Sequence, residues 1–248
     1  MKICLIGQNL TNMILANVFE EKELNVDIYL NKKIQNIKTN RTIALSSENF
    51  DYLKFLSKSS IKPWKSKEIK IFTEGSQSKE IINFNKKNKE AFNLISYSKL
   101  NEIFSKKIKK SKFIKLNHLD TSSPFILKKI KNYDLVINSE KKNFISNKFF
   151  TNKIKKNYGS RAYTFVINHR RKNNDIAIQV FTKFGPLAFL PLSNTKTSIV
   201  FSHKGDKIDD KKILEIFNKY NSFYSLTKIG EIEKFSLSFE MLRNYTHN

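Results

Sequence analysis

The run from Gln179 to Leu192 constrains the fold of this 248-residue chain more than any other segment, because glycine and proline interrupt an apolar stretch at fixed points. Gly185 and Pro186 form a turn signal, and an apolar run follows them. Pro191 lacks the backbone N–H that a sheet ladder needs, so it predicts the end of a strand. Local pattern alone favours an edge strand after a hairpin and a strand facing a flat partner about equally.

The N-terminal segment has the pattern of a strand, a helix and a second strand. Residues 2–7 are an apolar run that ends in Gly7, and residues 24–30 are a second apolar run. Between them, Leu10, Ile14 and Val18 recur at helical spacing. This order predicts the βαβ unit with which dinucleotide-binding folds begin.

The glycine fingerprint of such a unit is altered here. The run reads Gly7-Gln-Asn9-Leu-Thr-Asn12, so only the first of the three glycines of G-x-G-x-x-G is present. Asparagine adopts positive φ more readily than most residues, although its side chain occupies space that a phosphate needs. Asn31 stands where a carboxylate at the end of the second strand would meet a ribose hydroxyl, and an amide can still form that hydrogen bond.

Several segments together resemble flavin-dependent aromatic-ring monooxygenases. They are the Gly-Pro-Leu-Ala-Phe-Leu-Pro run from Gly185, the flanking segments 162–166 and 197–202, and Arg41-Thr-Ile-Ala-Leu-Ser46. The resemblance is strongest to the ubiquinone-biosynthesis hydroxylase branch of the p-hydroxybenzoate-hydroxylase-like family, and it covers essentially the whole chain. A further segment, Ser139 to Asn143, lies where that family has Gly-Ala-Asp-Gly, with Glu140 at the acidic position.

This resemblance implies FAD as the cofactor and assigns residues to it. Arg41 would lie beside the cofactor phosphates, and the strand after Gly185 would form a wall over the flavin ring. The implied wall residues are Gln179, Gly185, Pro186, Leu187, Ala188, Phe189 and Pro191. The implied cofactor-binding residues are Gly7, Asn9, Asn12, Asn31, Arg41 and Glu140. In such enzymes the cofactor carries the oxygen chemistry, so no catalytic acid or base is predicted.

The implied fold class is α/β, with two interleaved parts. A Rossmann-like FAD-binding domain is expected from residues 1–65 and 90–155, and a mostly antiparallel β-sheet substrate domain from residues 66–89 and 156–240. In the family, a Gly-Asp-x-x-His motif follows the run that here ends at Tyr245, so this final FAD segment is expected to be missing after residue 248.

Two functions stay open on this basis. One is FAD-dependent hydroxylation of a polyprenylated aromatic ring in ubiquinone biosynthesis, with O₂ and NAD(P)H as co-substrates. The other is a non-catalytic truncated remnant that serves as an interaction or scaffold subunit among other ubiquinone-biosynthesis proteins. The altered glycine motifs leave open whether the chain is an enzyme.

Composition limits the partners. The formal net charge is +24, which is typical of proteins that meet nucleic acid or anionic membranes. The lysines are spread along the chain with Asn and Ile, and no RNA-binding aromatic signature or helix-turn-helix pattern accompanies them, so nucleic-acid binding is not expected. A diffuse positive surface does favour peripheral contact with an anionic membrane.

Metal sites, disulfides and membrane spans are not expected either. The four histidines, His118, His169, His203 and His247, are far apart and lack metal-ligand spacing. Cys4 is the only cysteine, so the chain can form no internal disulfide. No apolar run approaches the ~20 residues of a membrane span, and no signal pattern opens the chain. The sequence therefore predicts a cytoplasmic protein, peripheral to the inner membrane at most.

Overall fold

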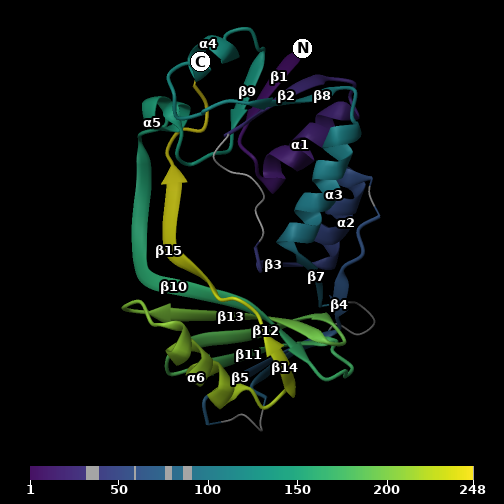
Figure 1. The fold of residues 1–248 in the computed structure, drawn as a ribbon, viewed down its shortest axis with the longest axis vertical. Helices are drawn as coiled ribbons and strands as arrows, with labels where there is room; N and C mark the ends of the chain where they lie inside the picture. Colours follow the sequence, from purple (N-terminus) through teal and green to yellow (C-terminus); the bar gives the residue numbers. More distant parts are fainter. Residues whose placement is uncertain (32–38, 59, 76–79, 86–90, 248) are drawn as a thin grey trace.

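The computed structural model describes residues 1–31, 39–58, 60–75, 80–85 and 91–247. Within these residues the strands form a parallel sheet, a large mixed sheet and a small antiparallel sheet. Figure 1 shows the parallel sheet and its helices at one end of an elongated molecule and the large sheet at the other, with both chain termini at the first end.

The parallel sheet has the strand order β8-β2-β1-β9. Its strands are β1 (Lys2–Ile6), β2 (Asn25–Leu30), β8 (Ile114–His118) and β9 (Leu135–Asn138). The helices beside it are α1 (Leu10–Glu20), α2 (Ser47–Ser57), α3 (Tyr97–Lys110), α4 (Ile126–Ile130) and α5 (Phe144–Phe149). The predicted strand–helix–strand start is confirmed, since β1 and β2 pair in parallel on either side of α1 in sequence.

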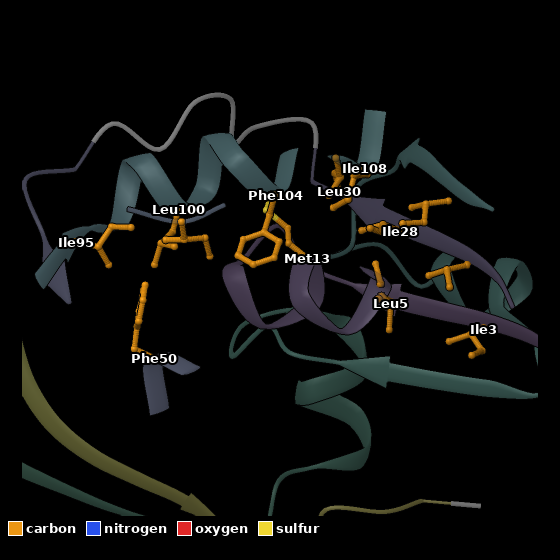
Figure 2. Packing of buried hydrophobic residues seen from close by; sticks show 14 residues of the cluster. Ile3, Leu5, Met13, Ile28, Leu30, Phe50, Ile95, Leu100, Phe104 and Ile108 are labelled. Atoms are coloured by element: carbon orange, nitrogen blue, oxygen red, sulfur yellow. The ribbon is translucent and has the colours of Figure 1, made fainter. Parts of the chain in front are cut away.

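Alternate residues of β1 serve two different cores. Ile3 and Leu5 are buried in one hydrophobic cluster with residues of α1 and α3, among them Met13 and Phe104, and Figure 2 shows this cluster as sticks. Cys4 and Ile6 face the other way, toward α4 and α5. A strand covered on both faces needs apolar residues at every position, which explains the unbroken run at the N-terminus.

Burial raises the pKa of the Cys4 thiol to about 12, with the nearby Asp27 carboxylate adding to the effect. The side chain is fully buried. Cys4 therefore acts as a small apolar core residue, because a thiol that stays protonated is a poor nucleophile.

Helix α3 follows its sequence pattern closely. Ser96 caps its N-terminus, with the Oγ atom accepting a hydrogen bond from the Lys99 backbone N–H at 3.1 Å. Leu100, Phe104 and Ile108 form the buried stripe that the spacing predicts. Figure 2 shows the three of them along one side of the helix, facing α1 and the parallel sheet.

The large sheet has the order β14-β10-β13-β12-β11-β5-β6, and β15 also pairs with β10. Its strands are β5 (Glu68–Thr73), β6 (Ile82–Asn85), β10 (Lys153–His169), β11 (Ile176–Thr182), β12 (Gly185–Ser193), β13 (Lys196–Lys204), β14 (Leu226–Ile229) and β15 (Glu233–Leu242). All pairings are antiparallel except β11 with β5.

Helix α6 (Asp210–Tyr220) packs on one face of this sheet. Phe217 meets the ring of Phe165 edge-on, with 5.3 Å between ring centroids, and also contacts Phe189 at 6.1 Å. The small sheet, with order β3-β7-β4, lies near β12 and consists of β3 (Thr42–Leu45), β4 (Trp64–Ser66) and β7 (Phe92–Ser96).

Strand β12 excludes one of the two alternatives that its local pattern left open, and it is longer than expected. It lies between β11 and β13, so it is no edge strand, and it continues through Pro191 to Ser193 instead of ending there. Pro186 is paired with a residue of β11 but none of β13, whereas Pro191 is paired with β13 but not with β11. At each proline, therefore, β12 is paired with only one of its two neighbouring strands. A central strand can contain proline at such a position without losing a ladder hydrogen bond.

In the described part of the chain, no helix is long and apolar enough to cross a membrane. The same residues contain no group of three or more side chains that could hold a metal ion together.

Candidate cofactor site

Gly7 begins the loop between β1 and α1, at the carboxyl end of the parallel sheet. Its φ of +116° lies in the region that glycine tolerates best, and its N–H donates to the Tyr29 carbonyl at 3.0 Å. Strand order reverses between β1 and β9, and such a switch point is where open α/β sheets bind ligands. The first glycine of the fingerprint thus stands in the position that its role requires.

Asn9, at the second glycine position, is the N-cap of α1. Its φ of −140° is extended, so the tolerance of asparagine for positive φ is not used. Its Oδ1 accepts a hydrogen bond from the Asn12 N–H at 3.0 Å, and its Nδ2 donates to Ser139 Oγ at 2.6 Å. One amide of the helix N-terminus is therefore satisfied by a side chain, and this loop is joined to the loop after β9.

Asn12, at the third glycine position, is fully buried beneath the loop. Its Nδ2 donates to the carbonyl oxygens of Ile6 and Gly7, both at 2.9 Å. Its Oδ1 is also buried and has no hydrogen-bond partner among the described residues. Asn12 therefore holds the Gly7 turn in place with its amide, where the fingerprint uses a glycine for close helix packing.

Glu140 packs its side chain against Gly7. A Cβ atom built on Gly7 would lie 2.6 Å from Glu140 Cγ, and the Oε2 atom of Glu140 accepts a hydrogen bond from Thr121 Oγ1 at 2.9 Å. A carboxylate at this point opposes a phosphate electrostatically. The structure also places Ser139 in the loop as a partner of Asn9, a role that sequence reasoning missed because nothing local marks a contact across 130 residues.

Arg41 lies apart from this loop in its contacts. The Arg41 guanidinium stacks over Tyr97 of α3 and Phe235 of β15, at 5.5 and 5.8 Å from the ring centroids. In the described residues, no hydrogen bond or ion pair joins Arg41 to the loop after β1. Asn31 directly follows β2 and is half-buried at the same carboxyl edge as Gly7.

The loop keeps part of what a dinucleotide diphosphate needs. The backbone N–H groups of Leu10 and Thr11, in the first turn of α1, have no acceptor within the described part of the chain. Free amides at a helix N-terminus, with the positive end of the helix dipole, form an anion site. The loop therefore offers the hydrogen-bond donors that a diphosphate needs, but the Asn9 and Glu140 side chains reduce the space for it.

The expected wall residues divide between the two faces of the large sheet. Leu187, Phe189 and Pro191 are buried, and the first two belong to the core beneath α6. Gln179 and Ala188 are cross-strand partners on the opposite face and are only half-buried. Gly185 opens the strand and Pro186 is exposed. Only the face of Gln179 and Ala188 is free of α6.

That second face also carries residues that the sequence analysis did not assign to the site. Val200 is paired with Ala188, and Thr164 is paired with Val200, so both share the face of Gln179. Thr164 Oγ1 is buried without a hydrogen-bond partner among the described residues. Strand alternation could have placed these residues, but only the register shows which strands are neighbours.

No protein-family model matches the chain, and no curated protein matches it in sequence. Solved structures do match its fold. p-Nitrophenol 4-monooxygenase from Pseudomonas putida aligns with a TM-score of 0.74 and 8% identity over 99% of this chain and 70% of that chain. A 2-methyl-3-hydroxypyridine-5-carboxylic acid oxygenase aligns with a TM-score of 0.73 and 8% identity over 99% and 72%.

A third structure, of CtdE in complex with FAD and a substrate, aligns with a TM-score of 0.71 and 12% identity over 97% of this chain and 69% of that chain. The chain therefore has the fold of FAD-dependent monooxygenases. The predicted α/β class, with a parallel sheet beside a mostly antiparallel one, is confirmed.

Proposed function

We propose that this chain is an FAD-dependent monooxygenase that hydroxylates a polyprenylated aromatic ring in ubiquinone biosynthesis, with O₂ and NAD(P)H as co-substrates. The observation that carries the proposal is the Gly7 loop at the switch point of a monooxygenase fold, with two amides of α1 that find no acceptor among the described residues. Two of the similar structures are named as oxygenases of aromatic rings and a third was solved with FAD, which supports the reaction class and the cofactor.

In this proposal FAD supplies the oxygen activation, and the protein binds and orients the reactants. The Leu10 and Thr11 amides hold the diphosphate, and Asn31 holds the ribose. The sheet face of Gln179 and Ala188 forms the wall on the flavin side. The ubiquinone branch of the assignment rests on the sequence resemblance of the Arg41 and Gly185 segments.

The same proposal includes contact with a membrane and with other proteins. A polyprenylated substrate resides in a membrane, and the net charge of +24 favours peripheral contact with anionic lipid headgroups. Other ubiquinone-biosynthesis proteins would then be neighbours on that membrane.

Titration of the purified chain with FAD tests the proposal, with quenching of flavin fluorescence as the readout. Saturable binding at micromolar FAD is the expected result. Asn9→Gly should bind FAD more tightly, because it removes the side chain anchored to Ser139, while glycine at an N-cap costs the helix only a few tenths of a kcal/mol. Asp209→Gly, which alters the equivalent cap of α6, should leave FAD affinity unchanged.

Absence of saturable binding for both the wild type and Asn9→Gly at millimolar FAD would contradict the cofactor assignment. It would favour the second function, a non-catalytic interaction subunit. The observation behind that alternative is that Asn9, Ser139 and Glu140 occupy the diphosphate side of the loop with mutual contacts. Such a subunit would co-purify with ubiquinone-biosynthesis proteins and carry no flavin absorbance.

A further inference from the structure

A cavity of about 450 Å³ lies between the small sheet and the end of the large sheet. This volume lies in the range of small-molecule sites. It is lined by Thr39, Asn40, Lys62, Trp64, Leu94, Ile95, Ser96, Lys99, Val166, Leu192 and Lys196. Its wall thus comes from β4, β7, the first turn of α3, and strands β10, β12 and β13.

Three lysines line this cavity, and none of its other lining residues that the structure describes is a carboxylate. Lys62, Lys99 and Lys196 are all exposed, which places them where the cavity opens to solvent. Within the described residues none of the three has an ion-pair partner, although eleven such pairs occur elsewhere in that part of the chain. Lys99 does lie near Glu102 of the same helix, a carboxyl whose pKa is lowered by Lys106 and, less strongly, by Lys99. The three lysines still outnumber that one carboxylate, which creates a positive potential at the opening.

The carboxylate of Glu233 is hydrogen-bonded to residues of the cavity wall. Glu233 accepts hydrogen bonds from the Asn40 backbone N–H at 2.6 Å and from Thr39 Oγ1 at 2.7 Å. It therefore binds neutral groups of the cavity wall and does not pair with the lysines. The positive charge at the opening stays available for an incoming anion.

The N-terminus of α3 adds to this potential. Ser96 lines the cavity as the helix cap, and Lys99 lies in the first turn of the same helix. A cation near a helix N-terminus is unfavourable, because the helix dipole is positive there. An anion bound beside Ser96 and Lys99 would offset both charges at once.

A buried hydroxyl group lies on the same face of the large sheet. Ser198 is the cross-strand partner of Val166, which lines the cavity, and it is fully buried. Its Oγ atom has no hydrogen-bond partner among the described residues. A buried hydroxyl without a partner is rare, because the lost hydrogen bond costs about 1–3 kcal/mol.

The remaining wall is apolar. Trp64 and Leu94 are cross-strand partners on one face of the small sheet, and Val166 and Leu192 of the large sheet line the same cavity. The Trp64 Nε1 atom is held by the Asn174 carbonyl at 2.6 Å, which fixes the ring. An apolar wall with a cationic opening matches a ligand that has an apolar body and one acidic end.

We propose that this cavity binds a small organic anion, with its carboxylate or phosphate group at Lys62, Lys99 and Lys196 and its apolar body against Trp64. The inference deepens the proposed function and rests on it in one respect, namely that the ligand is the substrate. The ring to be hydroxylated would then carry an acidic group. Binding itself needs no flavin, so it is tested without one.

The test uses Trp64 fluorescence, because Trp64 is the only tryptophan of the chain. The flavin-free chain is titrated with benzoate, phenyl phosphate, benzamide and inorganic phosphate. Saturable fluorescence changes are expected for benzoate or phenyl phosphate, and the tighter of the two identifies the acidic group. Benzamide, a neutral analogue of benzoate, and inorganic phosphate, which lacks an apolar body, should bind at least about tenfold more weakly.

Three triple variants separate recognition from net charge. K62Q/K99Q/K196Q should lose at least about tenfold in affinity for the organic anion. K109Q/K128Q/K211Q removes the same charge from exposed sites outside the cavity and should keep wild-type affinity. K62R/K99R/K196R retains the charges and should bind like the wild type, which shows that substitution at these three positions is tolerated and that the glutamine variant lost its charge.

Several outcomes would overturn the proposal. They are equal binding of benzamide and benzoate, equal losses in the cavity and control triples, and no saturable binding of either organic anion at millimolar concentration. Inorganic phosphate that binds as tightly as phenyl phosphate would overturn the role of the apolar wall. Failure of FAD binding with intact anion binding contradicts only the hydroxylase function, and the reverse result contradicts only this cavity.

Discussion

Gly185 shows how one residue can control the approach of two strands. It has a φ of +129°, and a Cβ atom there would lie 2.0 Å from the Ser202 carbonyl oxygen of β13. Thr182 Oγ1 donates to the Gly185 carbonyl at 2.7 Å and completes the turn between β11 and β12. The sequence marked this glycine as part of a turn, but only the tertiary structure reveals the neighbouring strand that excludes a side chain.

Gly185→Ala should destabilise the protein by more than about 3 kcal/mol, because positive φ and a backbone clash both oppose the methyl group. Gly75→Ala is the matched control, since Gly75 has a φ of +90° with nothing within 4 Å of a built Cβ. It should cost only about 1 kcal/mol from backbone strain. Urea unfolding measures both, and equal losses would show that the contact with Ser202 carries no penalty.

The asparagines of the Gly7 loop show which roles of single residues the sequence can predict. Their positions in the altered fingerprint follow from the sequence, and so does the doubt about space for a phosphate. The hydrogen bond from Asn9 to Ser139 does not, because it joins residues 130 positions apart. Side-chain amides form whichever hydrogen bonds the fold brings within reach, so spacing alone cannot assign them.

At the scale of elements, α6 covers the large sheet with a stripe of apolar residues. Ile213, Ile216, Phe217 and Tyr220 are buried, in the spacing of one helical face. Phe217 contacts aromatic rings on two different strands. This helix was not predicted as an element, although its periodicity would have identified it.

Phe217→Ala should cost about 3–5 kcal/mol in the free energy of unfolding, the usual range for a phenylalanine removed from a core. Phe55→Ala is the control on α2, because Phe55 is 73% exposed. It should change stability by less than about 0.5 kcal/mol. Thermal or urea unfolding distinguishes them, and similar losses would contradict the packing of α6.

Glu74 links the end of β5 to α6 by electrostatic interactions. Interaction with the Tyr220 hydroxyl, the Lys183 backbone N–H and the Lys219 ammonium lowers its pKa to about 2 from 4.5. Glu74 Oε2 lies 2.7 Å from the Lys183 nitrogen, and Oε1 lies 3.1 Å from Lys219 Nζ. The folded state thus favours the charged carboxylate.

A lowered pKa makes this link dependent on pH. Its contribution to stability should be complete above the unfolded pKa of 4.5 and should disappear as the pH falls toward about 2. Glu74→Gln should therefore melt below the wild type at pH 7, and the difference should shrink through that window. Lys219→Met should weaken this dependence. Melting curves that stay a constant interval apart from pH 7 to pH 3 would refute the link.

At the scale of the whole molecule, the excess of positive charge opposes the compact state. A net charge of +24 on one chain produces self-repulsion that salt screens. The screening length falls from about 30 Å at 0.01 M to about 8 Å at 0.15 M ionic strength. The melting temperature should therefore rise by several degrees between these conditions. K109Q/K128Q/K211Q should show a smaller rise, and a fall in melting temperature with salt would contradict this account.

The sequence by itself determined many of the local elements, because periodicity and turn residues act over short distances, and its resemblance to the monooxygenase family implied the fold class. The βαβ start, the buried stripe of α3 and the strands flanking Gly185 follow from such patterns, and so does the altered fingerprint after Gly7. Tertiary structure alone decided which strands are neighbours. It placed β12 inside the sheet, directed Leu187 and Phe189 toward α6, and brought three lysines to one cavity opening. These outcomes depend on strand register and packing between distant segments, which no local pattern encodes.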